Sequence, residues 1–254
     1  MSGASQAGTG SGSRARRTLP RRTGPPLAVS MPDGQAPYPG VVIGAEAYGL
    51  NPFIRGVQHR LVRLGYAAAV PDYYHGEGPR DVEAYDDFAE VVEHIGRLDF
   101  TCGARDLAKA VDTLRATPGV DPRRVGLWGY CTGGTLAWLA ACLRGDVAAA
   151  VLFFPSQPVF GELGPKTPVH PVDLLWQLTC PTLFIYGDRD PVMGPERLDG
   201  LRAGIDRWGI DAEVRRYAGA GHSFSAPWGP LRHDEADRAA WDDALAFLRA
   251  HTEG

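Results

Sequence analysis

The chain has 254 residues, a formal net charge of −4 at pH 7 and 44% hydrophobic residues, values typical of one ordinary globular domain. The slightly acidic balance argues against a nucleic-acid or anionic-membrane partner, and no apolar run reaches the ~18–20 residues of a membrane-spanning helix. The four cysteines form neither a CxxC pair nor a Cys/His cluster, which excludes the common zinc spacings and a disulfide framework. We therefore expect a cytoplasmic monomer without a metal or an organic cofactor.

Residues 1–26 differ from the rest of the chain. They contain five Gly, four Ser, three Pro and five Arg, with no acidic residue. Such a segment cannot bury enough apolar surface to offset the entropy lost on ordering. We expect a disordered, solvated tail over residues 1–26, followed by a single domain over residues 27–254.

From residue 27 onward, short runs of Val, Ile and Ala alternate with apolar residues at helical spacing. Alternation of strands with helices predicts a parallel sheet that helices cover on both faces, joined by right-handed crossovers. Residues 155–178, rich in Pro and Gly, predict an excursion over the sheet edge. In chain order we expect strand 41–43, helix 53–64, strand 66–70, helix 107–114, strand 125–128, helix 135–143, strand 147–154, strand 182–186, helix 198–205, a weaker strand 214–217 and helix 241–248.

The sharpest motif is Gly129-Tyr130-Cys131-Thr132-Gly133-Gly134, between the predicted strand 125–128 and helix 135–143. It matches G-x-nucleophile-x-G, the nucleophile elbow, with Cys where Ser is more common. A turn this tight strains the backbone of its central residue, and side chains two residues away on either side would collide. The thiol would project at a helix N-terminus, where a thiolate and a developing oxyanion are favoured. The alternative is a buried cysteine in a glycine-rich turn.

Two later segments can supply the partners of such a thiol. Asp188 and Asp190 follow the predicted strand 182–186, and His222 follows the last predicted strand. Sites of open α/β sheets lie at the carboxyl ends of the strands, and the order nucleophile, acid, base is that of α/β-hydrolases. Either aspartate can be the acid, and a turn cap is the other role for each. The six remaining histidines are expected to be structural or solvated.

Taken together, these segments resemble the dienelactone hydrolase family. The GYCTGG element, residues 187–192 and Gly221-His222-Ser223-Phe224 carry the resemblance, as do residues 46–51 and 65–72, in order from about residue 41 to 248. The resemblance implies an α/β-hydrolase fold with a mostly parallel, doubly wound sheet and helices on both faces. It also implies Cys131 as the nucleophile, Asp190 as the acid and His222 as the base.

The same resemblance gives roles to residues after the first predicted strand. It implies that Glu46 contacts the thiol and moves when substrate binds, and that the backbone N–H groups of Ala47 and Thr132 form the oxyanion hole. From the residues alone, Glu46 directly follows the strand at residues 41–45, and the loop after this strand supplies the second oxyanion donor in α/β-hydrolases. A carboxylate beside a thiol raises the pKa of the thiol by like-charge repulsion. The alternative for Glu46 is a hydrogen bond to backbone at a helix entrance.

The predicted substrate pocket departs from the family pattern. Dienelactone-cleaving members carry an Arg shortly after the base His that helps to hold the substrate carboxylate, whereas this chain has Ala226 there and no Arg before Arg232. Arg80 lies near the place of a second such Arg, at loose spacing, and a solvated role fits it equally well. The residues expected to bind the substrate are Tyr48, Arg80, Tyr85 and Phe224, with Tyr73 and Tyr74 beside them and Trp228 at the edge.

The sequence therefore predicts a hydrolase that cleaves a small ester or lactone through a thioester on Cys131, without a metal. A thioesterase or a tailoring hydrolase acting on a bulky neutral secondary metabolite is the first alternative. A non-catalytic thiol sensor or binding protein that uses the same cavity is the second. The partner expected in each case is a small molecule.

Overall fold

The computed structural model describes residues 24–79, 88–227 and 229–253. Nearly all of the predicted tail therefore lies outside the described residues, as do Arg80, Tyr85 and Trp228. In the part of the chain that the structure describes, no helix is both long and apolar enough to cross a bilayer.

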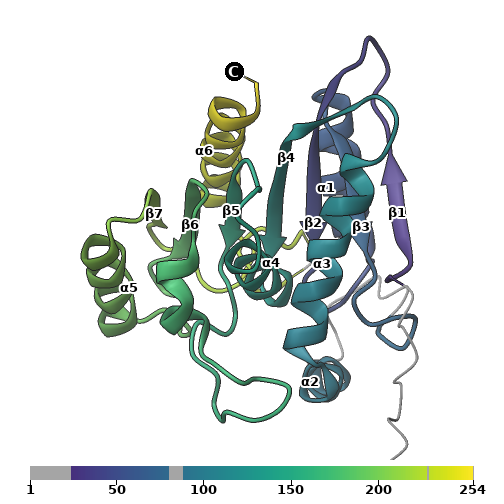
Figure 1. The fold of residues 1–254 in the computed structure, drawn as a ribbon. Helices are drawn as coiled ribbons and strands as arrows, with labels where there is room; N and C mark the ends of the chain where they lie inside the picture. The colour runs from purple at the N-terminus through teal and green to yellow at the C-terminus, as the bar shows by residue number, and fades with distance from the viewer. Residues whose placement is uncertain (1–23, 80–87, 228, 254) are drawn as a thin grey trace, which may run out of the picture.

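One seven-stranded sheet forms the centre of the molecule, in the order β1-β3-β2-β4-β5-β6-β7 (Figure 1). All neighbouring strands pair in parallel except β1, which pairs antiparallel with β3 at one edge. The central strands are fully buried, as expected of a parallel sheet covered on both faces. The strands are β1 (Leu27–Ser30), β2 (Tyr38–Gly44), β3 (Ala67–Pro71), β4 (Val120–Tyr130), β5 (Ala150–Phe153), β6 (Thr182–Gly187) and β7 (Ala212–Tyr217).

Helices cover both faces of this sheet. A Cβ placed on Gly40 would meet Leu114 of α3, whereas one on Gly126 would meet Leu248 of α6, so the two helices lie on opposite faces. On the second face, α1 adjoins α6, since the Arg60 guanidinium lies 3.6 Å from the ring centroid of Trp241. The helices are α1 (Pro52–Arg63), α2 (Phe88–Arg97), α3 (Phe100–Arg115), α4 (Thr132–Cys142), the 3-10 helix η1 (Pro171–Gln177), α5 (Pro195–Trp208) and α6 (Asp234–Thr252).

This architecture confirms the predicted mostly parallel sheet with helices on both faces and every strand expected from the apolar runs. Three elements were missing from the prediction: β1, α2 and η1. Strand β1 has only four residues and a half-exposed pattern at the sheet edge, and α2 has a single buried stripe. The excursion at residues 155–178 contains η1, which packs against α4 and α5.

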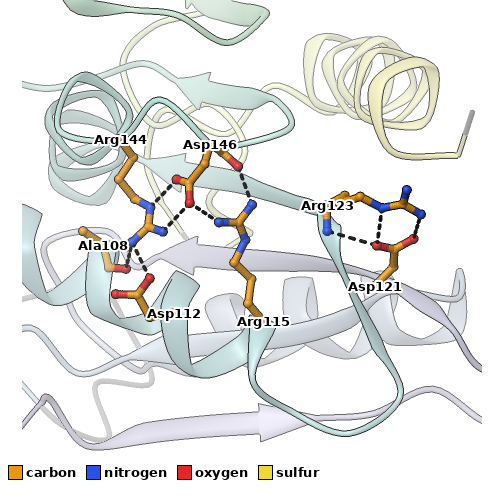
Figure 2. Close-up of polar contacts among 7 residues, drawn as sticks. All are labelled: Ala108, Asp112, Arg115, Asp121, Arg123, Arg144 and Asp146. Carbon is orange, nitrogen blue, oxygen red and sulfur yellow. Dashed lines mark hydrogen bonds and ion pairs between the residues drawn. The ribbon is translucent and has the colours of Figure 1, made fainter.

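A cluster of arginine and aspartate side chains joins α3 to the turn between α4 and β5 (Figure 2). Arg144 donates to the carbonyl oxygen of Ala108 over 2.8 Å and pairs with Asp112 over 2.7 Å. Its remaining nitrogens form a bidentate pair with the Asp146 carboxylate over 2.8 Å, and Arg115 pairs with that same carboxylate. Because α4 begins at Thr132 and ends just before Arg144, this cluster lies at the end of α4 far from Cys131.

Candidate active site

Cys131 occupies a sharp turn between β4 and α4. Its backbone has φ 51° and ψ −116°, a left-handed conformation that costs a residue with a side chain free energy. The neighbouring glycines make the turn possible. A Cβ on Gly129 would lie 2.4 Å from the carbonyl oxygen of Gly133, and one on Gly133 would lie 2.2 Å from that of Ala45. The start of α4 therefore packs directly on backbone, with Cys131 at its N-terminus.

His222 lies beside the sulfur and is held from behind by Asp190. The distance from His222 Nε2 to Cys131 Sγ is 3.2 Å, and that from His222 Nδ1 to Asp190 Oδ2 is 2.9 Å. The Asp190 side chain is fully buried, and its second oxygen accepts the N–H of Val192 over 2.8 Å. Asp188 instead accepts the N–H of Gly219 over 2.7 Å, as a turn-capping side chain does. The structure thus brings Asp190, and not Asp188, to the imidazole.

The electrostatics of the pair favour a thiolate beside an imidazolium. Burial raises the pKa of the Cys131 thiol. The charge of His222 and its hydrogen bond to the sulfur have a larger, opposite effect, so the pKa of the thiol lies below its ordinary value. Burial opposes a charged His222, yet the charge of Cys131 and the hydrogen bond to Asp190 outweigh it and raise the pKa of His222 to about 10. The charge of Glu46 opposes ionisation of the thiol.

Glu46 is buried in the loop after β2, with 2% of its surface exposed, and lines the same cavity as Cys131. Asn51 donates its side-chain amide to Glu46 Oε1 over 2.6 Å. The hydroxyl of Tyr73 donates to the backbone carbonyls of Ala45 and Glu46, over 3.1 and 2.7 Å, and the Tyr74 hydroxyl donates to that of Ala47 over 2.9 Å. These two tyrosines therefore hold the loop that carries Glu46 and Ala47.

Ala47 and Thr132 are the two positions whose backbone N–H groups are predicted to form the oxyanion hole. Ala47 lines the cavity that contains Cys131. Thr132 is the first residue of α4, so its N–H has no acceptor within the helix. This placement is compatible with the predicted use of both N–H groups as oxyanion donors.

A cavity of about 470 Å³ opens over these residues. Its walls are largely apolar, and among its described lining residues there is no Lys or Arg. Ser156, Gln157 and Ser223 supply neutral polar groups. The remaining lining residues are Glu46, Ala47, Tyr48, Val91, Ile95, Cys131, Pro191, Val192, His222, Ala226, Gly229, Pro230 and Leu231.

Of the residues predicted to bind substrate, the structure places Tyr48 in this cavity. Phe224 was predicted wrongly. It is fully buried and its ring packs against Phe154 and Tyr217, because the left-handed conformation of Ser223 (φ 57°) turns the chain back into the core after His222. Tyr73 and Tyr74 do not line the cavity either. Arg80 and Tyr85 lie outside the described residues.

Several lining residues were not anticipated from sequence. Val91 and Ile95 come from α2, which lies at the end of the sheet where the parallel strands point (Figure 1). Their i, i+4 spacing is the one signal that could have identified an amphipathic helix there. Ser156 and Gln157 follow β5 in a Pro-Ser-Gln-Pro stretch that matches no motif.

A second cavity of about 490 Å³ lies between η1 and α5, away from the thiol. Its lining includes Leu175, Arg197 and Trp208 but none of Cys131, Asp190 and His222. Chemistry, rather than size, therefore selects the cavity over Cys131 as the candidate active site. In the three described segments, no group of three or more His, Cys, Asp or Glu side chains is arranged to hold a metal ion.

Comparisons with known proteins agree with the family resemblance of the sequence. The model of the dienelactone hydrolase family matches residues 27–252. A relative from Yersinia pestis, whose name describes a carboxymethylenebutenolidase, is 29% identical over 232 residues, covering 89% of this chain and 84% of the relative. One from a Bradyrhizobium species, named for 2-oxo-3-(5-oxofuran-2-ylidene)propanoate lactonase activity, is 29% identical over 216 residues, 85% of each chain. A solved structure named for a dienelactone hydrolase from Klebsiella pneumoniae superposes with a TM-score of 0.78 at 27% identity, over 88% of this chain and 92% of that one.

Proposed function

Because the chain belongs to the dienelactone hydrolase family and is an ester or lactone hydrolase, we propose that it cleaves its substrate by nucleophilic catalysis at Cys131. In this proposal His222 is the base and Asp190 is the acid that orients it. One observation carries the assignment: the sulfur, the imidazole and the carboxylate stand in series, at 3.2 and 2.9 Å, at the strained turn that begins α4.

The reaction proceeds through a thioester. The Cys131 thiolate attacks the carbonyl carbon, and the N–H groups of Ala47 and Thr132 bind the oxyanion that forms. Collapse breaks the carbon–oxygen bond, and the imidazolium of His222 gives its proton to the leaving oxygen. His222 then removes a proton from water, which attacks the thioester carbonyl carbon. Collapse of this second tetrahedral intermediate breaks the carbon–sulfur bond, releases the free acid and regenerates the Cys131 thiolate beside the His222 imidazolium.

Glu46 adjusts the reactivity of the thiol. Its carboxylate opposes the negative charge on sulfur, so it limits the thiolate population while no substrate is bound and protects the thiol from oxidation. The Asn51 amide over 2.6 Å and the tyrosines that bind the neighbouring carbonyls keep the Glu46 carboxylate in place.

The preferred substrate is a neutral ester or lactone. The charged groups in the described lining are Glu46 and the Cys131–His222 pair, whose charges offset each other. This lining contains no Lys or Arg to bind a substrate carboxylate, and Ala226 presents a methyl group. A buried hydrogen bond to a charged group contributes roughly 1.5–3 kcal/mol. Without such a bond, kcat/KM for a lactone that carries a carboxylate should be about 10–100-fold lower. By contrast, the lactone in the name of the Bradyrhizobium relative is a propanoate, which carries a carboxylate. A bulky neutral ester or thioester, as a thioesterase or tailoring hydrolase would use, fits the same apolar walls.

Two kinetic comparisons test the assignment of Cys131 as the nucleophile and the preference for a neutral substrate. With an activated aryl ester, the protein should release product and Cys131→Ala should lose roughly 10³-fold or more in kcat. With a free acid and its methyl ester of equal size, the methyl ester should be the better substrate. If the acid is better and Arg80→Ala abolishes that preference, the neutral-substrate proposal fails while the nucleophile assignment stands. If neither ester is hydrolysed, the result favours the alternative of a non-catalytic thiol sensor or binding protein.

A further inference from the structure

Ser156 follows β5 and lines the same cavity as Cys131. Its backbone N–H donates to the carbonyl oxygen of Cys131 over 3.2 Å, which fixes the segment after β5 to the sharp turn. Its hydroxyl donates to Gln157 Oε1, and the interaction of this hydroxyl with the Cys131 sulfur lowers the pKa of the thiol. The Thr132 hydroxyl lies 3.5 Å from Ser156 Oγ and 4.0 Å from Cys131 Sγ. The hydroxyls of Ser156 and Thr132 and the side-chain amide of Gln157 therefore lie close to one another at the turn that carries the sulfur.

The Ser156 hydroxyl has a single hydrogen and two competing acceptors. While the sulfur is a neutral thiol, the amide oxygen of Gln157 is the better acceptor, because a thiol sulfur accepts hydrogen bonds weakly. Once the sulfur carries a full negative charge, a charge-assisted bond to it is roughly twice as strong as a neutral one. Thr132 can then donate to the oxygen of Ser156 and support the new orientation.

We propose that the Ser156 hydroxyl alternates between Gln157 Oε1 and Cys131 Sγ, so that it stabilises the sulfur only while the sulfur is ionised. During the reaction the hydroxyl bonds the attacking thiolate, turns back to Gln157 when the thioester removes the charge, and returns to the sulfur when the thiolate leaves. No covalent bond to Ser156 forms. This role rests on the proposed use of Cys131 as the nucleophile, and it makes Gln157 the partner of the Ser156 hydroxyl whenever the sulfur is uncharged, as it is in the thioester.

The position of Gln157 suits it to accept the hydrogen bond of the Ser156 hydroxyl. Its backbone N–H donates to the Thr135 hydroxyl of α4 over 3.0 Å, which holds its side chain against Ser156. The other groups that act electrostatically on the sulfur are Glu46 after β2, Tyr73 and Tyr74 after β3, and His222 with Asp190 behind it. The α2 residues among the described lining of the cavity, Val91 and Ile95, are uncharged. None of these groups is altered by changing Ser156 or Gln157, so a change in thiol ionisation reports on the hydroxyl.

The test is the pH dependence of the alkylation rate of Cys131 by iodoacetamide, measured on the full chain by mass mapping. Ser156→Ala should move the midpoint of that profile up by about half a unit to one unit, the size expected for one charge-assisted hydrogen bond less the neutral one it replaces. Ser156→Thr, which keeps a hydroxyl, should restore it. Gln157→Met removes the competing acceptor and should move the midpoint down by a few tenths of a unit.

Opposite shifts are the signature, since a loss of packing would not move the two midpoints in opposite directions. An unchanged midpoint in Ser156→Ala, an unchanged midpoint in Gln157→Met, or shifts of the same sign in both would overturn the inference. The proposed function fails separately, when Cys131→Ala keeps its esterase activity. Equal thermal unfolding midpoints for the three variants confirm that each is folded.

Discussion

The imidazole Nε2 of His222 lies 3.2 Å from the sulfur of Cys131, although 91 residues separate them in the chain. Three features of the fold create this contact. Glycines at positions 129 and 133 allow the turn that exposes the sulfur, β7 ends beside β6, and Asp190 at the end of β6 holds the far nitrogen of the ring. The contact ties the reactivity of the thiol to the orientation of one buried carboxylate.

Asp190→Asn should be far more damaging than Asp188→Asn. An amide at position 190 can no longer stabilise an imidazolium and can hold the ring in the wrong tautomer, so kcat should fall by roughly 10³-fold or more. Asp188 caps a turn at Gly219, so its loss should cost stability with little change in kcat. Steady-state kinetics with an aryl ester compare them, and equal losses would show that the wrong aspartate has been assigned.

Replacement of Glu46 by Gln should lower the pH at which Cys131 becomes reactive. The Glu46 carboxylate raises the pKa of the thiol by like-charge repulsion, so its neutral isostere leaves the thiolate more stable and shifts its formation to lower pH. The alkylation rate of Cys131 should therefore rise at a pH below the midpoint of the parent protein. The rate of inactivation by peroxide should rise with it, because oxidation requires the thiolate. A midpoint that moves up would contradict this role.

Tyr73→Phe should lower kcat more than it raises KM. The lost hydroxyl binds the carbonyls of Ala45 and Glu46, and these precede the N–H group assigned to the oxyanion. A loosened donor weakens binding of the oxyanion rather than of the substrate ground state, so a loss of about 10-fold in kcat is expected. An increase in KM with unchanged kcat would instead indicate a role in substrate binding.

Arg144→Ala should destabilise the protein without affecting catalysis. Arg144 joins α3 to the α4–β5 turn through Ala108, Asp112 and Asp146, at the end of α4 far from Cys131 (Figure 2). Both aspartates are partly solvated, so a loss of about 1–2 kcal/mol in the free energy of unfolding is expected. Arg123→Ala is the matched control, because the Arg123 side chain that pairs with Asp121 is solvent-exposed and its loss should destabilise the protein less. Urea unfolding measures both, and similar losses would contradict the account.

The sequence predicted the features that local chemistry dictates. The alternation of apolar runs with segments of helical spacing indicated a parallel sheet with helices on both faces. The comparisons confirm the α/β-hydrolase fold and the family resemblance. The glycines around Cys131 marked the turn because only they leave room for backbone contact. Asp188 and Asp190 could not be separated by spacing alone, since both follow the same strand and differ in which tertiary partner they reach.

The sequence failed where tertiary packing decides. Phe224 follows His222 directly and was expected in the pocket, but the conformation of Ser223 directs it into the core. Strand β1 is too short for a periodic signal and is defined by its pairing with β3. The contribution of Ser156 depends on how the segment after β5 meets the turn at Cys131, which no pattern within Pro155–Pro158 records.

The proposed mechanism depends on a thioester that forms on Cys131. Its most direct test is rapid-quench mass mapping of the protein after a brief reaction with an activated ester. We predict one acyl group per chain, attached to Cys131, formed in a burst before steady turnover and absent in Cys131→Ala. An acyl group on Cys102, Cys142 or Cys180, or steady turnover that persists in Cys131→Ala, would contradict it.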